Sequence, residues 1–549
     1  MTNLNVNEGI LAAYPWLKEI LAATGSCQTR ILMVADGIID FGHQFFGLSR
    51  LVEALRQGGR PGEEVIVSTA HRGGREGGRV AGDYQFRFEE GNFGIELYEQ
   101  VWLFGYEIDA DELSEAELKV LAEFMNRGGG VFATGDHANL GLALCGNVPR
   151  VRSMRKWRFD ADKVCRSSAP PRNDPCRHST VHEGRDPGYQ ATDESDDIPQ
   201  TIVPRLFENG CEVNPHELLA FGHVAITVLP DHMHEGECVE PTDEQLEQTI
   251  KYPDHPEFAE FPLMADGNTR PAPEVIALSV SAGGRLKEKQ EFHPPVIPRG
   301  FGAICAYDGD NVSVLEGATV GRVVVDASFH HFTDGNLDGA EAKLGRGFFD
   351  ADGKPTKDYA VITQYFRNIA AYLNPLAFRD RCNRRLLLFL RFMYPLIEEI
   401  RPDEEMTLSN LVEVGELTRR AISSYLSPAH AVGCALTLIN SVEGFDDLKI
   451  SVNPGLARRS NIRDVASLLN SHTLTNALLG VALLGIARPL AHEAGRVAEG
   501  LRKIESQGAG LEAGVKEGVR QVASIWEPII KQSREALSAF SSSPGGDEK

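Results

Sequence analysis

Short apolar runs separated by amphipathic stretches dominate the first 380 residues of the chain. The runs at residues 31–35, 64–69, 98–106 and 131–134 are rich in apolar side chains, which predicts strands covered on both faces. Apolar residues at helical spacing stand between the first and second runs, and again between the third and fourth. This β-α-β-loop-β-α-β order predicts an α/β domain with a parallel sheet and right-handed crossovers.

The clearest local signal leads into the fourth of these strands. Ser114 and Glu117 have the S-x-x-E spacing of a capping box, in which each side chain satisfies a backbone N–H at the start of a helix. Apolar residues then recur at helical spacing until the glycines at 128–130, which predict the end of the helix. The strand that follows releases Asp136 and His137 at its C-terminal end, where open α/β sheets place their ligands.

The regular alternation stops after the fourth strand. Residues 146–205 are rich in Arg, Pro, Asp and Ser and lack periodicity, which predicts a long loop-rich insertion that serves as a lid or binding loop. Apolar strand patterns resume at four places, residues 224–229, 275–280, 303–307 and 322–327. A helix predicted over 359–373 ends at Asn374 and Pro375, a normal stop. We therefore predict a first domain over residues 1–379.

The remainder of the chain, residues 380–540, has helical periodicity and only one strand-like run, at 448–452. Apolar residues at 4-3 spacing near its end predict a seam that packs along another helix. The seam consists of Leu490, Ala494, Val497, Leu501, Ile504, Leu511, Val515, Val519 and Val522. Glycines within it weaken the helix, so packing within the chain is favoured over pairing with a second copy, which would make a homo-oligomer. Residues 541–549 are expected to be a disordered tail.

Composition narrows the classes of function. A net charge of −23 with only short basic clusters argues against nucleic-acid binding, because phosphate contacts need Lys and Arg. The most apolar window, residues 477–486, is too short to cross a bilayer. Nine scattered cysteines without a C-x-x-C pair are typical of reduced thiols. We therefore expect a cytoplasmic protein with no membrane span.

Four predicted strand ends carry the same two types of side chain, carboxylate and imidazole. They are Asp36, Asp40 and His43 after the first strand, Asp136 and His137 after the fourth, Asp231, His232, His234 and Glu235 after residues 224–229, and His330, His331 and Asp334 after residues 322–327. If these strands share one direction, their C-terminal ends converge on one cleft. Imidazole and carboxylate groups in such a cleft can act as acid and base or bind a divalent metal.

Separate roles are predicted for these residues. His137 or His330 is the expected general base, and Asp136 or Asp231 is expected to orient it. The H-x-H spacing puts two imidazoles on one side of an extended segment. The predicted metal ligands, for Zn or Mn, are His232, His234 and Glu235, and the predicted substrate-binding residues are Asp36, Asp40, His43, His331 and Asp334. No spacing among them matches a zinc signature such as H-E-x-x-H.

Each of these motifs also has a structural interpretation. Asp36 followed by Gly37 is a common turn sequence, and Asp136 is suited to capping the next helix. One member of the His330-His331 pair could be a core histidine that is hydrogen-bonded to its surroundings. The H-x-H segment could be a solvated loop. These alternatives are left open by the sequence.

Nucleophilic catalysis has less support. No G-x-S-x-G elbow occurs at a strand end. Cys145 lies eight residues beyond His137 and is interpreted as a small buried or loop residue. The glycine-rich run at 73–78 has no P-loop lysine in place, so the sequence gives little support for phosphate binding there.

Two segments of the chain resemble a known family. Residues 98–106, Leu113-Ser114, the helix and the run GGGVFATGDH at 128–137 resemble the ThuA-like branch of the class I glutamine amidotransferase-like superfamily. Residues 321–326 followed by His330 resemble the later strand-and-histidine element of that group. The resemblance covers roughly residues 30–140 and 300–375 and implies a flavodoxin-like, mostly parallel sheet.

The resemblance also bears on chemistry. By analogy it implies a role in carbohydrate or small-metabolite chemistry. The amidotransferases of the superfamily need a cysteine at the elbow after the glycine-rich strand, where this chain has Asp136 and His137. Glutamine hydrolysis through a thioester is therefore not expected.

The sequence leaves two hypotheses for the function of the chain. The leading hypothesis is an enzyme, a ThuA-like hydrolase or acid–base catalyst that acts on a polar, sugar-like small molecule. The alternative is a non-catalytic ligand sensor or assembly protein that signals through the helical region, which the length of residues 380–540 and the 4-3 seam favour.

Overall fold

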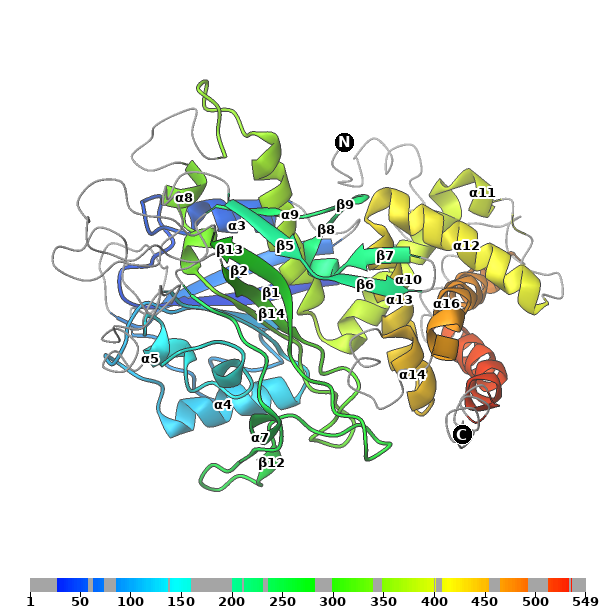
Figure 1. Cartoon of the computed structure of the whole chain (residues 1–549), viewed down its shortest axis with the longest axis horizontal. Helices are drawn as coiled ribbons and strands as arrows, with labels where there is room; N and C mark the ends of the chain where they lie inside the picture. Colours follow the sequence, from blue (N-terminus) through cyan, green and yellow to red (C-terminus); the bar gives the residue numbers. More distant parts are fainter. Residues whose placement is uncertain are drawn as a thin grey trace, which may run out of the picture.

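A computed structural model of the chain shows a sheet-based domain beside a helical region (Figure 1). The structure describes residues 27–57, 63–73, 85–136, 139–158, 200–209, 212–230, 236–281, 299–338, 348–398, 400, 407–453, 465–491, 512–532 and 535. In the described residues, the sheet domain is followed by a region whose elements are all helices. This is the predicted α/β class with a helical C-terminal region.

One half of the nine-stranded sheet is parallel, as predicted. It contains, in spatial order, β2 (Glu63–His71), β1 (Cys27–Ala35), β3 (Gln100–Phe104), β4 (Gly130–Thr134) and β15 (Val323–Asp326). Every neighbouring pair in this half is parallel. The C-terminal ends of these strands therefore lie at one edge of the sheet, which is the condition for a shared cleft.

The parallel strands alternate their side chains between two hydrophobic cores, because successive residues of a strand point to opposite faces. Ile31 lies in the core covered by α3 (Ser49–Arg56) and α9 (Lys357–Tyr372). Leu32 lies in the core covered by α4 (Glu115–Asn126). The sheet is thus the middle of three layers in this half, with α3 and α9 on one face and α4 on the other (Figure 1).

Helix α4 begins with the predicted capping box. Ser114 Oγ accepts a hydrogen bond from the backbone N–H of Glu117 (3.3 Å), and the Glu117 carboxylate accepts one from the backbone N–H of Ser114 (3.1 Å). The same carboxylate forms a buried ion pair with Arg72, which follows β2. Burial disfavours the charge, but these hydrogen bonds outweigh it and lower the pKa of Glu117. The cap therefore also ties α4 to the sheet.

The other half of the sheet is antiparallel, which the sequence pattern does not indicate. Beyond β15 come β14 (Arg299–Tyr307), β13 (Glu274–Ser281), β5 (Gln200–Pro204) and β10 (Val228–Leu229). Each neighbouring pair in this half is antiparallel, including the β14–β15 junction. Apolar runs predict that these strands are buried but not which way they point.

Two boundaries differ from the sequence prediction. The single strand predicted over 224–229 is wrong, because β9 (Val224–Ala225) pairs with β8 (Ala220–Phe221) and only β10 joins the large sheet. The described ends of the predicted insertion belong to the sheet domain: residues 146–158 contribute buried side chains to one core, and β5 is a strand of the sheet. Residues 159–199 lie outside the described part.

The helical region follows α9 directly. Its described helices are α10 (Leu376–Met393), α11 (Pro395–Glu398), α12 (Leu408–Tyr425), α13 (Pro428–Asn440), α14 (Asp446–Val452), α16 (Val465–Ala491) and residues 512–532. They share a third hydrophobic core, separate from the two cores of the sheet.

The strand-like run at 448–452 is helical, so that prediction is wrong. Leu448 and Val452 lie in the core of the helical region, whereas Ile450 lies in a core of the sheet domain. Helix α14 is therefore buried on two sides between both regions. Burial on opposite sides makes a short helix look like a period-two strand pattern in the sequence.

The end of the predicted 4-3 seam packs within the chain. Val515, Val519 and Val522 are buried in the same core as Leu478 and Ala482 of α16. These three residues of the seam therefore pack within the chain. The seam residues from Ala494 to Leu511 lie outside the described residues.

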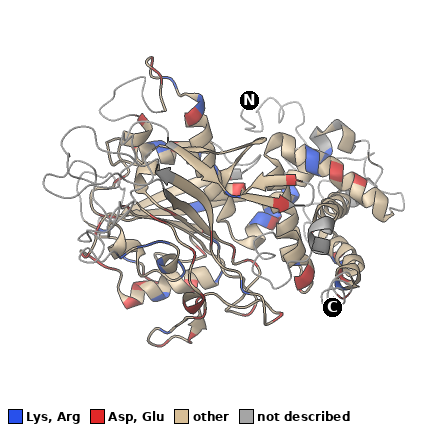
Figure 2. Ribbon diagram, in the orientation of Figure 1, with Lys and Arg blue, Asp and Glu red and all other residues tan. Residues whose placement is uncertain are grey.

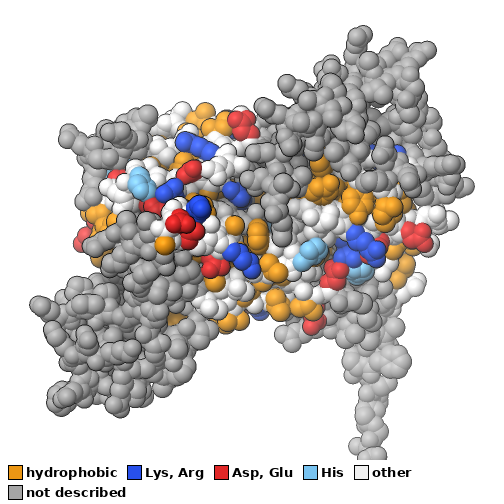
Figure 3. All heavy atoms as spheres, turned by 90° about the horizontal axis from the view of Figure 1, so that it is seen from above, with side chains coloured by type: hydrophobic (Ala, Val, Ile, Leu, Met, Phe, Trp, Pro, Cys, Tyr) orange, Lys and Arg blue, Asp and Glu red, His pale blue; other side chains and the backbone are white. Residues whose placement is uncertain are grey.

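Charged side chains of both signs are spread over the sheet domain and the helical region (Figure 2). In the basic cluster at 150–158, Arg150 and Arg155 are buried, and Arg152 pairs with Glu260 at 2.6 Å. On the face shown in Figure 3, described basic residues stand beside acidic ones. Among the described helices, none is both long and apolar enough to cross a membrane.

Candidate functional site

Three carboxylates lie at the C-terminal edge of the parallel strands. Asp36 follows β1, Asp136 follows β4, and Asp326 is the last residue of β15. All three side chains are buried. Strand β1 pairs with β2 on one side and with β3 on the other. Strands β3 and β4 are therefore added on the side of β1 opposite to β2, so the strand order reverses between β1 and β3. Such a switch point is where open α/β sheets form a ligand crevice.

Asp36 stands at this switch point. Its Oδ1 accepts backbone N–H groups from Tyr106 (2.5 Å) and Glu107 (3.2 Å), both of which follow β3. Burial disfavours the charged carboxylate more than these hydrogen bonds favour it, and it raises the pKa of Asp36 to about 7. Gly37 has φ +58°, and a Cβ there would stand 2.5 Å from the Tyr106 ring, so the turn also requires glycine. The turn interpretation and a proton-carrying carboxyl are therefore compatible.

Asp136 brings together two residues that follow β15. Its Oδ1 accepts a hydrogen bond from Ser328 Oγ at 2.8 Å. Its Oδ2 lies 3.5 Å from Nε2 of His330. The Ser328 hydroxyl also accepts the backbone N–H of His330 at 3.1 Å, which fixes the start of that segment. The structure thus joins one predicted base, His330, to one predicted orienting acid, Asp136.

The His330 ring is oriented from its other nitrogen as well. Nδ1 lies 2.9 Å from Oδ1 of Asn336, and because a carbonyl oxygen accepts, Nδ1 carries the hydrogen. Nε2 is then the nitrogen that lies near the carboxylate of Asp136. The side chain of His330 is 13% exposed, whereas that of Asp136 is fully buried. The imidazole is therefore the exposed member of the pair.

Aromatic rings surround this imidazole. Phe46, from the loop after β1, lies 5.8 Å from the His330 ring, and Phe329 lies 4.8 Å from it. Tyr106 packs against both Phe46 (6.4 Å) and Phe329 (5.9 Å). Residues following β1, β3 and β15 thus meet in one aromatic group. Apolar side chains around a few placed polar groups are typical of small-molecule sites.

His331, in contrast, is a core residue. Its Nδ1 lies 2.5 Å from Oδ1 of Asp326, and Tyr365 of α9 donates a hydrogen bond to the other oxygen of Asp326 at 2.7 Å. Its side chain is fully buried, and among the described residues Nε2 has no hydrogen-bond partner. A core histidine is therefore a simpler interpretation of His331 than the predicted substrate-binding residue.

Arg155 is a residue of this edge that sequence reasoning missed. Its buried guanidinium donates hydrogen bonds to the backbone oxygens of Ala327 (2.9 Å) and Asp136, and it lies over the Trp157 ring at 4.6 Å. Burial lowers the pKa of Arg155. It ties the ends of β4 and β15 together and places positive charge behind Asp136. A buried arginine in a basic cluster has no sequence signal that separates it from a solvated one.

Two predicted substrate-binding residues, His43 and Asp334, connect the loop after β1 to the segment after β15, and a third, Asp40, lies within that loop. Asp40 accepts the backbone N–H of Gly42 at 2.8 Å and so holds its own loop. Asp334 accepts the backbone N–H of Arg50 (2.8 Å) and the Ser49 hydroxyl (2.7 Å), which caps α3. The exposed His43 lies 3.3 Å from Asp334. Asp40 thus has a structural role in closing its loop, and Asp334 has a structural role in capping α3.

The other predicted site residues, His137, Asp231, His232, His234 and Glu235, lie outside the described residues. The flanks of the last four are placed. Leu229 ends β10, which three strands separate from β15, whereas the α-carbon of Gly236 packs against the Ala327 backbone at the end of β15. The described chain therefore leaves the sheet at its outermost strand, β10, and returns beside Asp136 and His330.

Thiol and metal chemistry gain no support from the described residues. Cys145 is buried beneath the β3 and β4 ends, and burial raises its pKa well above the ordinary value. This agrees with its interpretation as a small buried residue. Within the described part of the chain, no group of three or more His, Cys, Asp or Glu side chains is arranged to hold a metal. The predicted zinc or manganese site at 232–235 stays a prediction.

Comparison with known proteins gave no family model, no curated protein and no solved structure that matches the chain. No relative therefore supplies a function, and the chemistry of the site has to follow from its own geometry.

Proposed function

We propose that this chain is an enzyme that carries out hydrolysis or another acid–base reaction on a polar small molecule. The observation that carries the proposal is the Asp136–His330 pair, 3.5 Å apart at the ends of two neighbouring parallel strands. A base beside a buried carboxylate that stabilises its protonated form is an arrangement suited to proton transfer. In this proposal His330 takes a proton from water or a substrate hydroxyl, and Asp136 stabilises the imidazolium that forms.

Two further features support this site. The order β2-β1-β3-β4-β15 is that of a flavodoxin-like sheet, in which ligands bind at the switch between the first and third strands. Asp36 stands there with a pKa of about 7 and so carries a proton that a reaction near neutral pH can use. The ThuA-like resemblance of the sequence is consistent with this order, and we propose a sugar-like substrate on that analogy alone.

Replacing His330 with glutamine is expected to lower turnover by about 10²–10⁴-fold, the usual contribution of a general base. Glutamine keeps a hydrogen-bonding side chain of similar length but cannot take up a proton. The measurement is ¹H NMR of a defined pool of sugars, sugar acids and glycosides incubated with the full chain. The matched control is His472→Gln, which removes a histidine 3.7 Å from Glu416 in the helical region.

The control variant should keep the wild-type rate. The proposal is overturned if the wild-type chain converts no member of the pool, or if His330→Gln and His472→Gln are equally active. Circular dichroism of both variants shows whether either loss of activity comes from unfolding.

A further inference from the structure

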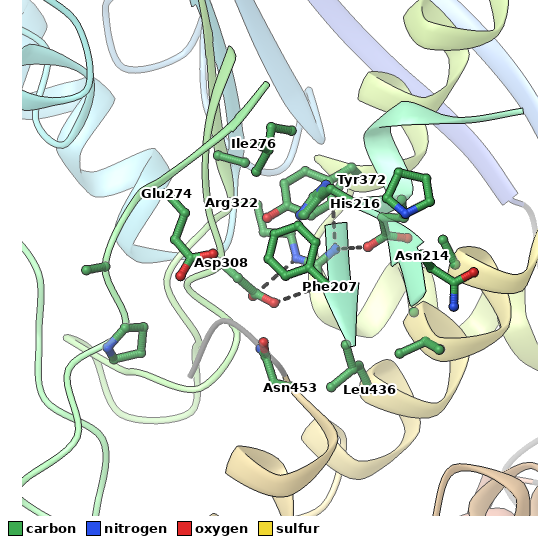
Figure 4. Close-up of a pocket in the computed structure, with 18 residues that line it drawn as sticks. Phe207, Asn214, His216, Glu274, Ile276, Asp308, Arg322, Tyr372, Leu436 and Asn453 are labelled. Carbon is green, nitrogen blue, oxygen red and sulfur yellow. Dashed lines mark hydrogen bonds and ion pairs between the residues drawn. The ribbon is translucent and has the colours of Figure 1, made fainter. Parts of the chain in front are cut away.

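A second cavity lies at the opposite end of the parallel strands, between the sheet domain and the helical region (Figure 4). Arg322 at its wall immediately precedes β15, whereas Asp326 ends that strand beside the candidate site. Four residues of strand separate them by about 13 Å. The cavity is therefore distinct from the site of Asp136 and His330.

Strands of the sheet domain and one helix of the helical region build this cavity. Phe207 belongs to β6 (Leu206–Asn209) and Ile276 to β13, whereas Val432 and Leu436 belong to α13. Figure 4 shows Ile276 on the strand side of the cavity and Leu436 with its helix on the opposite side. A molecule held here contacts both regions at once.

The charged groups in the wall already have partners. Asp308 accepts hydrogen bonds from the Arg322 guanidinium through both of its oxygens, at 3.2 and 3.0 Å, and Glu217 lies 3.2 Å from the same guanidinium. Arg322 also lies over the Tyr372 ring at 4.2 Å. Glu274, the other charged residue of the wall, has an interaction of its own. An ion in the cavity would give up its hydration without gaining an unmatched charge, so the wall favours a neutral occupant.

Most of the remaining wall is aromatic or aliphatic. The His216 ring packs edge-on against Phe207 (5.9 Å) and Tyr372 (5.2 Å), and the aliphatic residues of β13 and α13 complete the apolar surface. The volume of the cavity is about 110 Å³. A cavity of roughly 150 Å³ with aliphatic and aromatic walls holds benzene. Wall and volume together therefore suit a compact ring.

His216 adds a hydrogen-bond donor to this wall. Its Nδ1 accepts the backbone N–H of Leu218 at 3.2 Å. Burial lowers the pKa of His216 to about 4 despite Glu217, so at pH 7 the ring is neutral and carries its hydrogen on Nε2. This Nε2–H has no hydrogen-bond partner among the described residues. A donor without a partner beside an apolar surface favours a ligand with one acceptor, such as a carbonyl oxygen.

We propose that this cavity binds a small neutral ring compound with a carbonyl or similar acceptor, which lies between β13 and α13 and accepts the Nε2–H of His216. The site is independent of the proposed catalytic pair. Because the ligand contacts both regions of the chain, it stabilises their association, and the helical region can respond to it.

The test uses three probes with the same six-membered ring: cyclohexanone, cyclohexylammonium and cyclohexanecarboxylate. Ligand-observed NMR titration of the full chain at pH 7 should give cyclohexanone a Kd at least about tenfold lower than that of either ion, because the buried ion has no unmatched partner. Val432→Phe, which fills the cavity without changing a charge, should abolish binding. His216→Phe keeps a ring but has no donor and should raise the Kd about three- to tenfold, the effect of one hydrogen bond.

Two controls keep the outcome decisive. Ile525→Phe adds similar bulk at a half-exposed position of residues 512–532 and should bind like the wild type, as should His330→Gln. Equal binding of either ion, an absence of cyclohexanone binding, or an unchanged Kd in a folded Val432→Phe chain would each overturn the proposal. If Val432→Phe does not fold, an unchanged Kd in the His216→Phe chain overturns it alone. None of these results depends on whether Asp136 and His330 are catalytic.

Discussion

Replacing Arg322 with methionine is expected to lower the free energy of unfolding by about 3–5 kcal/mol, because it leaves buried carboxylates without their cation. Arg322 is 2% exposed and pairs with Asp308, Asp310 and Glu217. Burial opposes its charge, but the neighbouring carboxylates outweigh burial and raise the pKa of Arg322 well above the ordinary value. Methionine fills similar volume, so the loss reports charge rather than a cavity.

Urea unfolding at pH 7 provides the measurement for Arg322→Met. Trp102 and Trp157 report on the sheet domain, and Trp526 reports on the helical region. The control is Arg420→Met, whose guanidinium is 66% exposed and pairs with Glu416 at 2.8 Å. An exposed pair of this kind is worth about 0–1 kcal/mol. If both variants unfold at the same urea concentration, Arg322 does not hold the network as described.

Replacing Asp36 with asparagine is expected to change how stability depends on pH. In the folded chain the pKa of Asp36 is about 7, whereas an unfolded aspartate titrates near 3.8. Its raised pKa contributes stability that is fully present below about pH 4 and is lost as the pH rises through about 7. Asparagine does not titrate but keeps an oxygen that can accept the N–H groups of Tyr106 and Glu107.

Relative to wild type, the Asp36→Asn chain should therefore gain stability between about pH 4 and pH 7 and show no further change above that. A shift of about three pKa units corresponds to a change of about 4 kcal/mol. Denaturant midpoints measured across this range check it, with Asp352→Asn as the exposed control. A difference that stays constant with pH would show that Asp36 is ionised throughout, and would remove its proposed proton from the site.

The sequence predicts those features that short segments determine by themselves. Ser114 and Glu117 form their capping box because the interaction spans three residues. The apolar runs that become β1, β3 and β4 are buried on both faces and contain few polar residues, so the apolar pattern alone identifies them as strands. The convergence of Asp136 and His330 also follows once β4 and β15 are both parallel members of the sheet.

Features that depend on distant partners are not visible in the pattern. Residues 448–452 alternate like a strand because two different cores bury α14. Arg155 is typical of a surface residue in composition, yet its partners are the backbone oxygens of Asp136 and Ala327. The cavity beside Arg322 is formed by segments more than 100 residues apart, from Phe207 to Val432. Such features need the tertiary structure.

The central claim, that Asp136 and His330 act as one catalytic unit, is tested most directly by a double-mutant cycle. The values of kcat/KM are measured for the wild-type chain, Asp136→Asn, His330→Gln and the double variant on the substrate found in the NMR pool. Residues that act as a unit are strongly non-additive. We predict that the double variant is no slower than the slower single variant. Losses that multiply would contradict the claim.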